Sequence, residues 1–155
     1  MSSGNDILDM YLYETGGLLE QLEETVLQAE RAGGFSQEDI NEIFRIMHTV
    51  KGSSAMMELE KPAEVAHRIE DLFFILRENS LTQEQQEHLA ALYELVFRGI
   101  DYFRGELERL AHAAPLTDNI DGILNSINAL AQALSGEKEN QKGCENEKNI
   151  TDEAM

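Results

Sequence analysis

Residues 36–57 read SQEDINEIFRIMHTVKGSSAMM, and this stretch carries the clearest evidence for the fold. Its apolar side chains recur every three or four positions, which is the spacing of one buried face of an α-helix. The stripe consists of Ile40, Ile43, Phe44, Met47, Val50 and Met57. Ser36 is a suitable N-cap for this helix, and Asp39 follows three residues later, as in a capping box. The stretch therefore predicts an amphipathic helix that contains His48.

The same periodicity continues on both sides of this stretch, and no segment shows the alternating pattern of a strand. The other predicted helices run from about residue 5 to 31 before Gly33-Gly34, from Lys61-Pro62 to about Asn79, from Thr82 with its capping partner Gln85 to Pro115, and from Thr117 to Ser135. The last of these has a narrow stripe made by Ile120, Ile123, Leu124, Ile127, Leu130 and Leu134. We therefore expect an all-α protein, an up-down four-helix bundle with an additional C-terminal helix packed on its flank.

The composition changes after residue 135. Residues 136–155 contain mainly Glu, Lys, Asn, Gln and Gly, and such a segment buries too little apolar surface to offset the entropy lost on ordering. We therefore predict one helical domain over residues 1–135, followed by a disordered charged linker or tail over residues 136–155. Two interpretations of this tail stay open, the connection to a further part of a longer protein and a natural acidic terminus.

Charge is the strongest feature of the composition. The 155 residues include 30 acidic and 12 basic side chains, which gives a net charge of -18. Such a surface repels phosphate backbones and anionic lipids, so we expect neither nucleic acid nor a membrane as a partner. The chain has no long apolar segment, no secretory signal and only one cysteine, Cys144, and these features predict a cytoplasmic location.

The chemistry of the predicted second helix centres on His48. Lys51 and Gly52 follow it at the spacing of one helical turn and therefore share its face. A glycine inside a helix costs about 1 kcal/mol relative to alanine, and bare backbone beside the imidazole would let another protein's active site approach closely. The ammonium of Lys51 is suited to neutralise negative charge on a group that approaches the ring.

The predicted third helix carries a second polar pair, His67 and Glu70, three residues apart. If the second and third helices pack antiparallel, Glu70 comes near His48. A carboxylate that accepts a hydrogen bond from Nδ1 would fix the tautomer in which Nε2 is the nucleophile. His67 would complete the polar network.

Two other interpretations remain open from the residues alone. In a metal-binding bundle His48, His67 and Glu70 would be ligands, although the charge of Lys51 would oppose a cation there. In a noncatalytic acidic adaptor the surroundings of His48 would be coincidental, and Glu70 would be a solvated helix charge.

Residues 44–55, FRIMHTVKGSSA, resemble the phosphorylation-site helix of histidine phosphotransfer (Hpt) domains, particularly the N-terminal domain of CheA-type chemotaxis kinases. Similar stretches extend the resemblance over about residues 7–110: Tyr11-Leu12-Tyr13-Glu14-Thr15, Ala66-His67-Arg68-Ile69-Glu70-Asp71-Leu72 and Phe97-Arg98-Gly99-Ile100-Asp101. One departure lies in Met57-Glu58-Leu59-Glu60, which has a glutamate where the family leads us to expect a glycine.

The resemblance implies a function in two-component signalling. His48 would accept a phosphoryl group from the catalytic domain of a histidine kinase and donate it to the aspartate of a response-regulator receiver domain. Lys51, His67 and Glu70 match the family's supporting residues. The chain has no nucleotide-binding or kinase signature of its own, so we expect it to bind no cofactor, with ATP and Mg used by the partner kinase domain. The isolated domain is expected to be a monomer.

Overall fold

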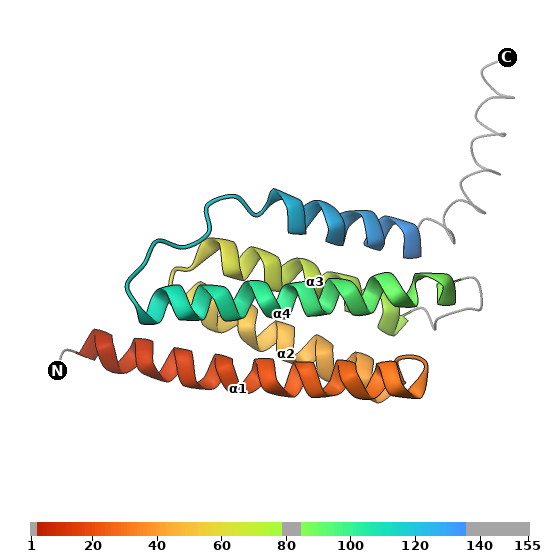
Figure 1. The fold of residues 1–155 in the computed structure, drawn as a ribbon, viewed down its shortest axis with the longest axis horizontal. Coiled ribbons are helices and arrows are strands. Elements are labelled where there is room, and N and C mark those ends of the chain that lie inside the picture. Colours follow the sequence, from red (N-terminus) through yellow and green to blue (C-terminus); the bar gives the residue numbers. More distant parts are fainter. Residues whose placement is uncertain (1–2, 79–84, 136–155) are drawn as a thin grey trace, which may run out of the picture.

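The computed structural model describes residues 3–78 and 85–135, and all the regular structure in these ranges is helical. The elements are α1 (Ser3–Ala32), α2 (Gln37–Met56), α3 (Glu60–Glu78), the 3-10 helix η1 (Gln85–His88), α4 (Leu89–Ala111) and a C-terminal helix over residues 121–135. The prediction of an all-α protein is confirmed (Figure 1). The predicted tail, residues 136–155, lies outside the described residues.

The turn between α1 and α2 follows the chemistry expected from its sequence. Gly33 ends α1 with a φ of 84°, a left-handed conformation that glycine adopts without a steric penalty. Ser36 then caps α2 reciprocally with Asp39. The Asp39 amide donates to the Ser36 hydroxyl at 3.0 Å, and the Ser36 amide donates to the Asp39 carboxylate at 3.0 Å. The predicted capping box is therefore confirmed.

The connection from α2 to α3 is short and contains a strained residue. Glu58 has a φ of 61°, so it occupies the left-handed region where a family glycine was expected. The Leu59 amide closes the turn by donating to the Ser54 carbonyl at 2.9 Å. Because α3 begins at Glu60, Pro62 is its third residue and not its first, as the sequence suggested. Its missing N–H still falls in the first turn, where amides have no partner within the helix.

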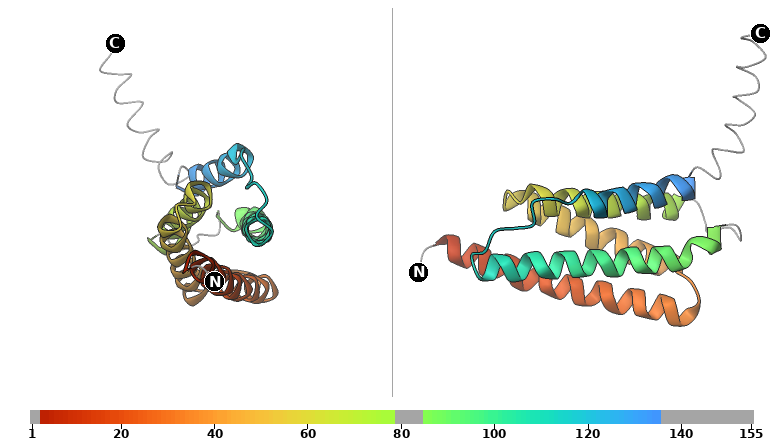
Figure 2. Two further views of the ribbon diagram at one scale, coloured as in Figure 1. Left: turned by 90° about the vertical axis from the view of Figure 1, so that its left-hand side faces the viewer. Right: turned by 45° about the horizontal axis from the view of Figure 1, so that its top comes forward.

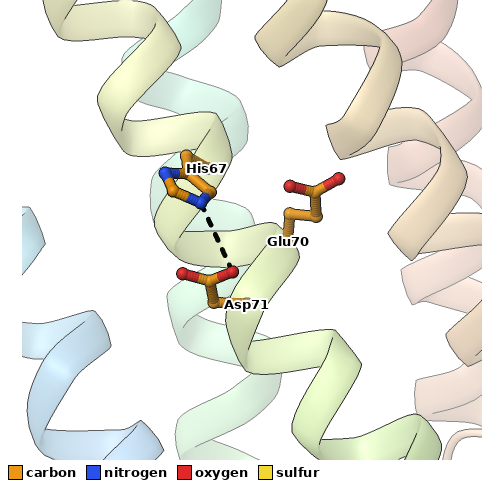
Figure 3. A group of neighbouring side chains, drawn as sticks. All are labelled: His67, Glu70 and Asp71. Atoms are coloured by element: carbon orange, nitrogen blue, oxygen red, sulfur yellow. Dashed lines mark ion pairs between the residues drawn. The ribbon is translucent and has the colours of Figure 1, made fainter.

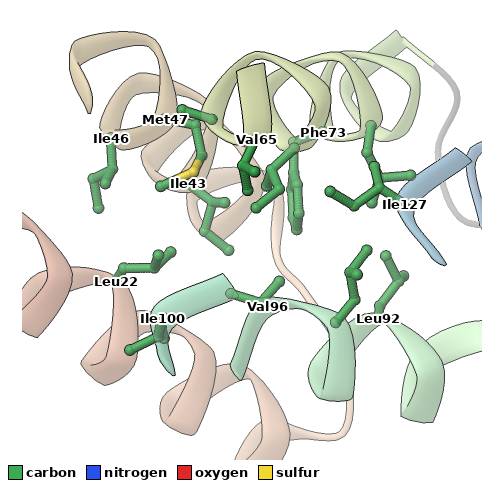
Figure 4. Packing of buried hydrophobic residues seen from close by; sticks show 14 of the residues in the cluster. Leu22, Ile43, Ile46, Met47, Val65, Phe73, Leu92, Val96, Ile100 and Ile127 are labelled. Carbon is green, nitrogen blue, oxygen red and sulfur yellow. The ribbon is translucent and has the colours of Figure 1, made fainter. Parts of the chain in front are cut away.

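The long helices enclose one apolar core. α1 packs against α2 and α4, and α3 packs against the same two helices. The clustered side chains come from every long helix and from the C-terminal helix (Figure 4). The residues labelled there are Leu22, Ile43, Ile46, Met47, Val65, Phe73, Leu92, Val96, Ile100 and Ile127.

The C-terminal helix lies beside α3 and α4 (Figures 1 and 2). Its predicted stripe is buried except for Leu124, which is partly buried. The predicted start at Thr117 is wrong, because the helix begins at residue 121 and the Asn119 side chain accepts from the Asp121 amide at 2.9 Å. The Thr117 amide instead donates to the buried carboxylate of Glu106 at 3.2 Å.

The start of α4 also differs from the prediction. Thr82 lies outside the described residues, and Gln85 belongs to η1, so the α-helix begins only at Leu89. Of the helices in residues 3–78 and 85–135, none has a stretch long and apolar enough to cross a bilayer.

Candidate functional site

His48 lies on the outer face of α2, opposite the buried residues Met47 and Val50. Its side chain is 65% exposed, so the imidazole is open to solvent although its helix is anchored in the core. The antiparallel packing of α3 on α2 brings Glu70 to this histidine across 22 positions of sequence. The site is therefore built by the two helices that the strained turn at Glu58 connects.

Glu70 is the centre of the polar contacts around His48. Its side chain is only 5% exposed, and each of its carboxylate oxygens has a partner. Oε2 lies at very short hydrogen-bond distance from Nδ1 of His48, and Oε1 accepts a hydrogen bond from Nζ of Lys51 at 2.7 Å. A buried carboxylate with both oxygens occupied holds its position, and it holds the imidazole with it.

The charge state of Glu70 follows from these contacts. Burial by itself would raise the pKa of the carboxyl group, but the hydrogen bonds and positive charge of Lys51 and His48 outweigh burial and place the pKa below its ordinary value. Glu70 is therefore ionised at neutral pH and only accepts hydrogen bonds. Nδ1 of His48 must then be the donor, so in the neutral form of the ring the contact selects the tautomer with its lone pair on Nε2.

His67 lies near this group without joining it. Its described polar contact is an ion pair with Asp71, in which Nε2 and Oδ1 are 3.5 Å apart. In Figure 3 the dashed line joins His67 to Asp71, and the Glu70 side chain lies on the side of α3 that faces α2. The structure thus brings Glu70 and Lys51 to His48, whereas it pairs His67 with a neighbour on its own helix.

The side chains around His48 are poorly arranged to bind a metal ion. Among the described residues, the group with ligand atoms within 4.8 Å of one another is His67, Glu70 and Asp71, and it does not include His48. Both oxygens of Glu70 already accept from Lys51 and His48, and the other two possible ligands, His67 and Asp71, are exposed and paired with each other. The donor set therefore does not favour the metal-binding alternative.

Gly52 lies on the exposed side of α2, close in sequence to His48. A Cβ atom placed on it would meet nothing within 4 Å, so the packing of this chain does not require a glycine there. By contrast, a Cβ on Gly99 would come within 3.0 Å of the Ile69 side chain. Bare backbone at Gly52 is therefore available to a molecule that approaches His48 from outside.

Two residues near the site were missed by the sequence interpretation. Phe44 was assigned to the buried stripe of α2, but it is only partly buried, and its ring lies nearly parallel to the imidazole at an interplanar angle of 13°. Arg77 on α3 holds its guanidinium 4.4 Å above the Phe44 ring. The four-residue spacing of Phe44 and His48 is a signal that sequence contains, whereas nothing in the sequence places Arg77 there.

An exposed histidine on a helical protein, held through Nδ1 by a buried carboxylate, is the kind of site that a phosphoryl carrier requires. The Hpt domain family model matches residues 6–113. The chain therefore belongs to the Hpt domain family.

Curated relatives agree with this assignment. The chemotaxis protein CheA of Halobacterium salinarum is 26% identical over 133 residues, which cover 86% of this chain and 19% of that protein. CheA of Treponema pallidum is 25% identical over 134 residues, 86% of this chain and 16% of that protein. The sensor histidine kinase CheAY of Helicobacter pylori is 26% identical over 137 residues, again 86% and 16%.

The chain thus spans less than a fifth of the length of these relatives. No solved structure is significantly similar to it. The family and the relatives support a phosphotransfer role in two-component signalling.

Proposed function

We propose that this chain is a phosphoryl carrier of chemotaxis-type two-component signalling and that His48 is the residue that carries the group. The observation on which this rests is the contact between the ionised, buried Glu70 and Nδ1 of the exposed His48. It supports the tautomer of the neutral ring in which the proton is on Nδ1 and Nε2 is free to react. The donor is ATP with Mg, bound by a histidine kinase catalytic domain, and the acceptor is an aspartate of a response-regulator receiver domain.

In the first step the Nε2 lone pair attacks the γ-phosphorus of ATP. The Nε2–P bond forms while the bond from phosphorus to the β,γ-bridging oxygen breaks, and that electron pair leaves with ADP. The ring becomes a phosphorylated imidazolium, with its proton still on Nδ1. The negative charge of Glu70 is favourably placed to stabilise the positive charge that develops on the ring.

In the second step the carboxylate of the receiver aspartate attacks the phosphorus. An O–P bond forms, the Nε2–P bond breaks, and its electron pair returns to Nε2, which restores the neutral imidazole. Gly52 contributes by leaving space for the acceptor, because no side chain fills the surface above it. The kinase domain and the receiver domain therefore approach the same exposed side of His48.

Lys51 is assigned a role in balancing charge. Its ammonium is bonded to the same carboxylate as His48, and its side chain keeps 30% exposure. It is therefore near enough to the ring to offset the charge of an incoming phosphoryl group while it holds Glu70 in place. His67 is assigned only a supporting role, since its described partner is Asp71.

The arrangement of the helices and the surface charge bear on the architecture and partners of the domain. We propose that the packing of α1 with α2 and α4, and of α3 with the same helices, is the up-down four-helix bundle of the family with the C-terminal helix on its flank. The acidic surface supports protein partners with basic surfaces and argues against nucleic acid. The domain itself is monomeric and cytoplasmic in this proposal.

The deciding experiment incubates the full chain with ATP, magnesium and an active CheA-type kinase core and then maps acid-labile phosphate. We expect the label on His48 and its transfer to a receiver domain added afterwards. His112→Gln is a matched control, because His112 is an exposed histidine at the end of α4 and should leave labelling unchanged. Label on another residue, or none while the kinase core phosphorylates its own cognate domain, would refute the proposal.

A further inference from the structure

Two pairs of side chains link α2 to α3 beside the proposed reactive histidine. One pair is His48 with Glu70. Four residues earlier on α2 and four residues later on α3, Phe44 and Phe74 form the second pair, with ring centroids 6.4 Å apart. Because the two helices run antiparallel, both pairs lie on the same face, one turn apart.

Arg77 lies over the rings of Phe44 and Phe74. Its guanidinium lies 4.4 Å from the centroid of Phe44 and 5.5 Å from that of Phe74, both within the range of a cation–π contact. Its described ion pair is with the neighbouring Glu78 at 3.8 Å, which is long and exposed and does not compete strongly for the guanidinium. The arginine therefore holds the Phe44 ring from the side of α3.

The Phe44 ring in turn meets the imidazole. The two ring planes are 13° from parallel, and their centroids are 6.4 Å apart along the helix. A hydrogen bond to Nδ1 fixes one point of the His48 ring but leaves the ring free to tip about that point. A flat neighbour on one side limits this tipping and so limits the direction in which Nε2 points.

Core packing accounts for only part of this cluster, because Phe44 packs against the core but its two neighbours are substantially exposed. Phe74 is 45% exposed, and the Arg77 side chain is 35% exposed, so these residues contribute less burial than the clustered residues beneath them. The exposed part of the cluster lies one turn from the one imidazole that the proposed reaction uses. The cluster of Phe44, Phe74 and Arg77 is therefore notable for its position beside His48 more than for the apolar surface it buries.

We propose that Phe44 is a positioning residue for His48 and that Arg77 holds Phe44 in this role. Glu70 sets the tautomer and anchors Nδ1, while the Phe44–Arg77 pair sets the plane of the ring, so that Nε2 meets the phosphorus in line. This inference rests on the phosphoryl-carrier function proposed above. Reacting groups gain much of their rate from such alignment, and small misplacements lower it by up to about 10²-fold.

The test compares phosphorylation kinetics of Phe44→Leu and Phe44→Tyr with the wild type, using the full chain as substrate of a kinase core. Phe44→Leu removes the flat ring and should lower kcat by roughly tenfold with little change in KM. Phe44→Tyr keeps the ring and should restore the rate. Phe97→Leu is the matched control, since Phe97 is also a partly buried aromatic residue packed on the core, but on α4.

A second pair of variants examines the arginine without removing the aromatic ring. Arg77→Met should lower kcat in the same direction as Phe44→Leu but less, and Arg77→Lys, which retains a cation, should recover part of the loss. If Phe44→Leu fails to fold, the two Arg77 variants still test whether the Phe44–Arg77 pair positions His48. An independent readout is the ring-current shift of the His48 carbon-bound protons in NMR spectra, which Phe44→Leu should abolish and Phe44→Tyr should preserve.

A folded Phe44→Leu protein phosphorylated at the wild-type rate would overturn the positioning role. So would an equal loss in Phe97→Leu, or a change confined to KM, which would make the cluster a docking surface. Absence of label on His48 in the wild type would overturn the proposed function and, with it, the purpose assigned to Phe44. That failure is distinguishable, because the NMR comparison needs no kinase.

Discussion

Replacing Glu70 by glutamine removes one charge from the site and almost no volume. In the wild type each carboxylate oxygen accepts from a different donor, Nδ1 of His48 and Nζ of Lys51. An amide offers one oxygen and one NH2 group, so only one of these donors can keep its acceptor. If the oxygen faces His48, the NH2 group confronts the Lys51 ammonium, and if the amide turns over, it confronts Nδ1.

The rate should fall by about 10² to 10³, because the ring loses the anion that stabilises its positive charge and part of the contact that fixes its tautomer. At 1.36 kcal/mol for each factor of ten, this loss corresponds to about 3 to 4 kcal/mol in the activation barrier. Folding should suffer less, by about 1 to 3 kcal/mol, because the side chain keeps its shape and one hydrogen bond while one donor at this buried site loses its acceptor. The variant thus separates chemistry from stability.

The assay is the initial rate of acid-labile labelling by a kinase core at saturating ATP, with the free energy of unfolding measured by urea denaturation. Glu64→Gln serves as the control, because Glu64 is an exposed acid on the same helix whose partner is Arg68. It removes an equal charge and should leave the rate within about twofold. A Glu70→Gln protein labelled at the wild-type rate would show that the carboxylate does not act on the imidazole.

Four further outcomes are expected. His48→Gln should abolish labelling while it changes the free energy of unfolding by about 1 kcal/mol or less; unfolding of this variant would make His48 structural. Gly52→Ala should stabilise α2 by up to about 1 kcal/mol in urea denaturation, since nothing obstructs the added methyl group, yet it should slow transfer to a receiver domain; unchanged transfer would remove the reason given for the glycine. Deletion of residues 136–155 should leave the melting temperature and labelling nearly unchanged, and a large loss of stability would show that this segment packs on the helices. The pKa of Glu70 is lowered from 4.5, so its charged form contributes stability that is complete above that pH and is lost as the pH falls through the lower pKa of the folded state; the stability difference between wild type and Glu70→Gln should therefore shrink as the pH is lowered below 4.5, and a constant difference would contradict the lowered pKa.

Local signals in the sequence were sufficient for much of the fold. The capping box of Ser36 and the stop at Gly33 depend on residues a few positions apart, so the pattern alone identifies them. Boundaries that depend on tertiary contacts were misplaced. The segment around Thr117 is held by the buried Glu106, and no local rule reveals that a capping residue is already engaged elsewhere.

The candidate site shows the same division. The approach of Glu70 to His48 followed from one assumption, that two helices joined by a short turn pack antiparallel. Periodicity fixes which face a residue occupies but not the angle of its ring or its partners on another helix. For that reason the pairing of His67 with Asp71 and the contact of Arg77 with Phe44 were not foreseen.

The attachment of the C-terminal helix gives the domain a physical boundary that differs from its family boundary. The Hpt match ends at residue 113, but Ile123, Ile127 and Leu134 are part of the same core as the long helices. Upstream, Lys61 fastens the connector to α3 through the Asp118 carboxylate at 2.6 Å. A chain cut at residue 113 would leave an apolar strip of α3 and α4 facing water, a surface that invites self-association. Because Leu134 is buried in this core, a chain transplanted into another protein should extend at least to that residue to keep the strip covered.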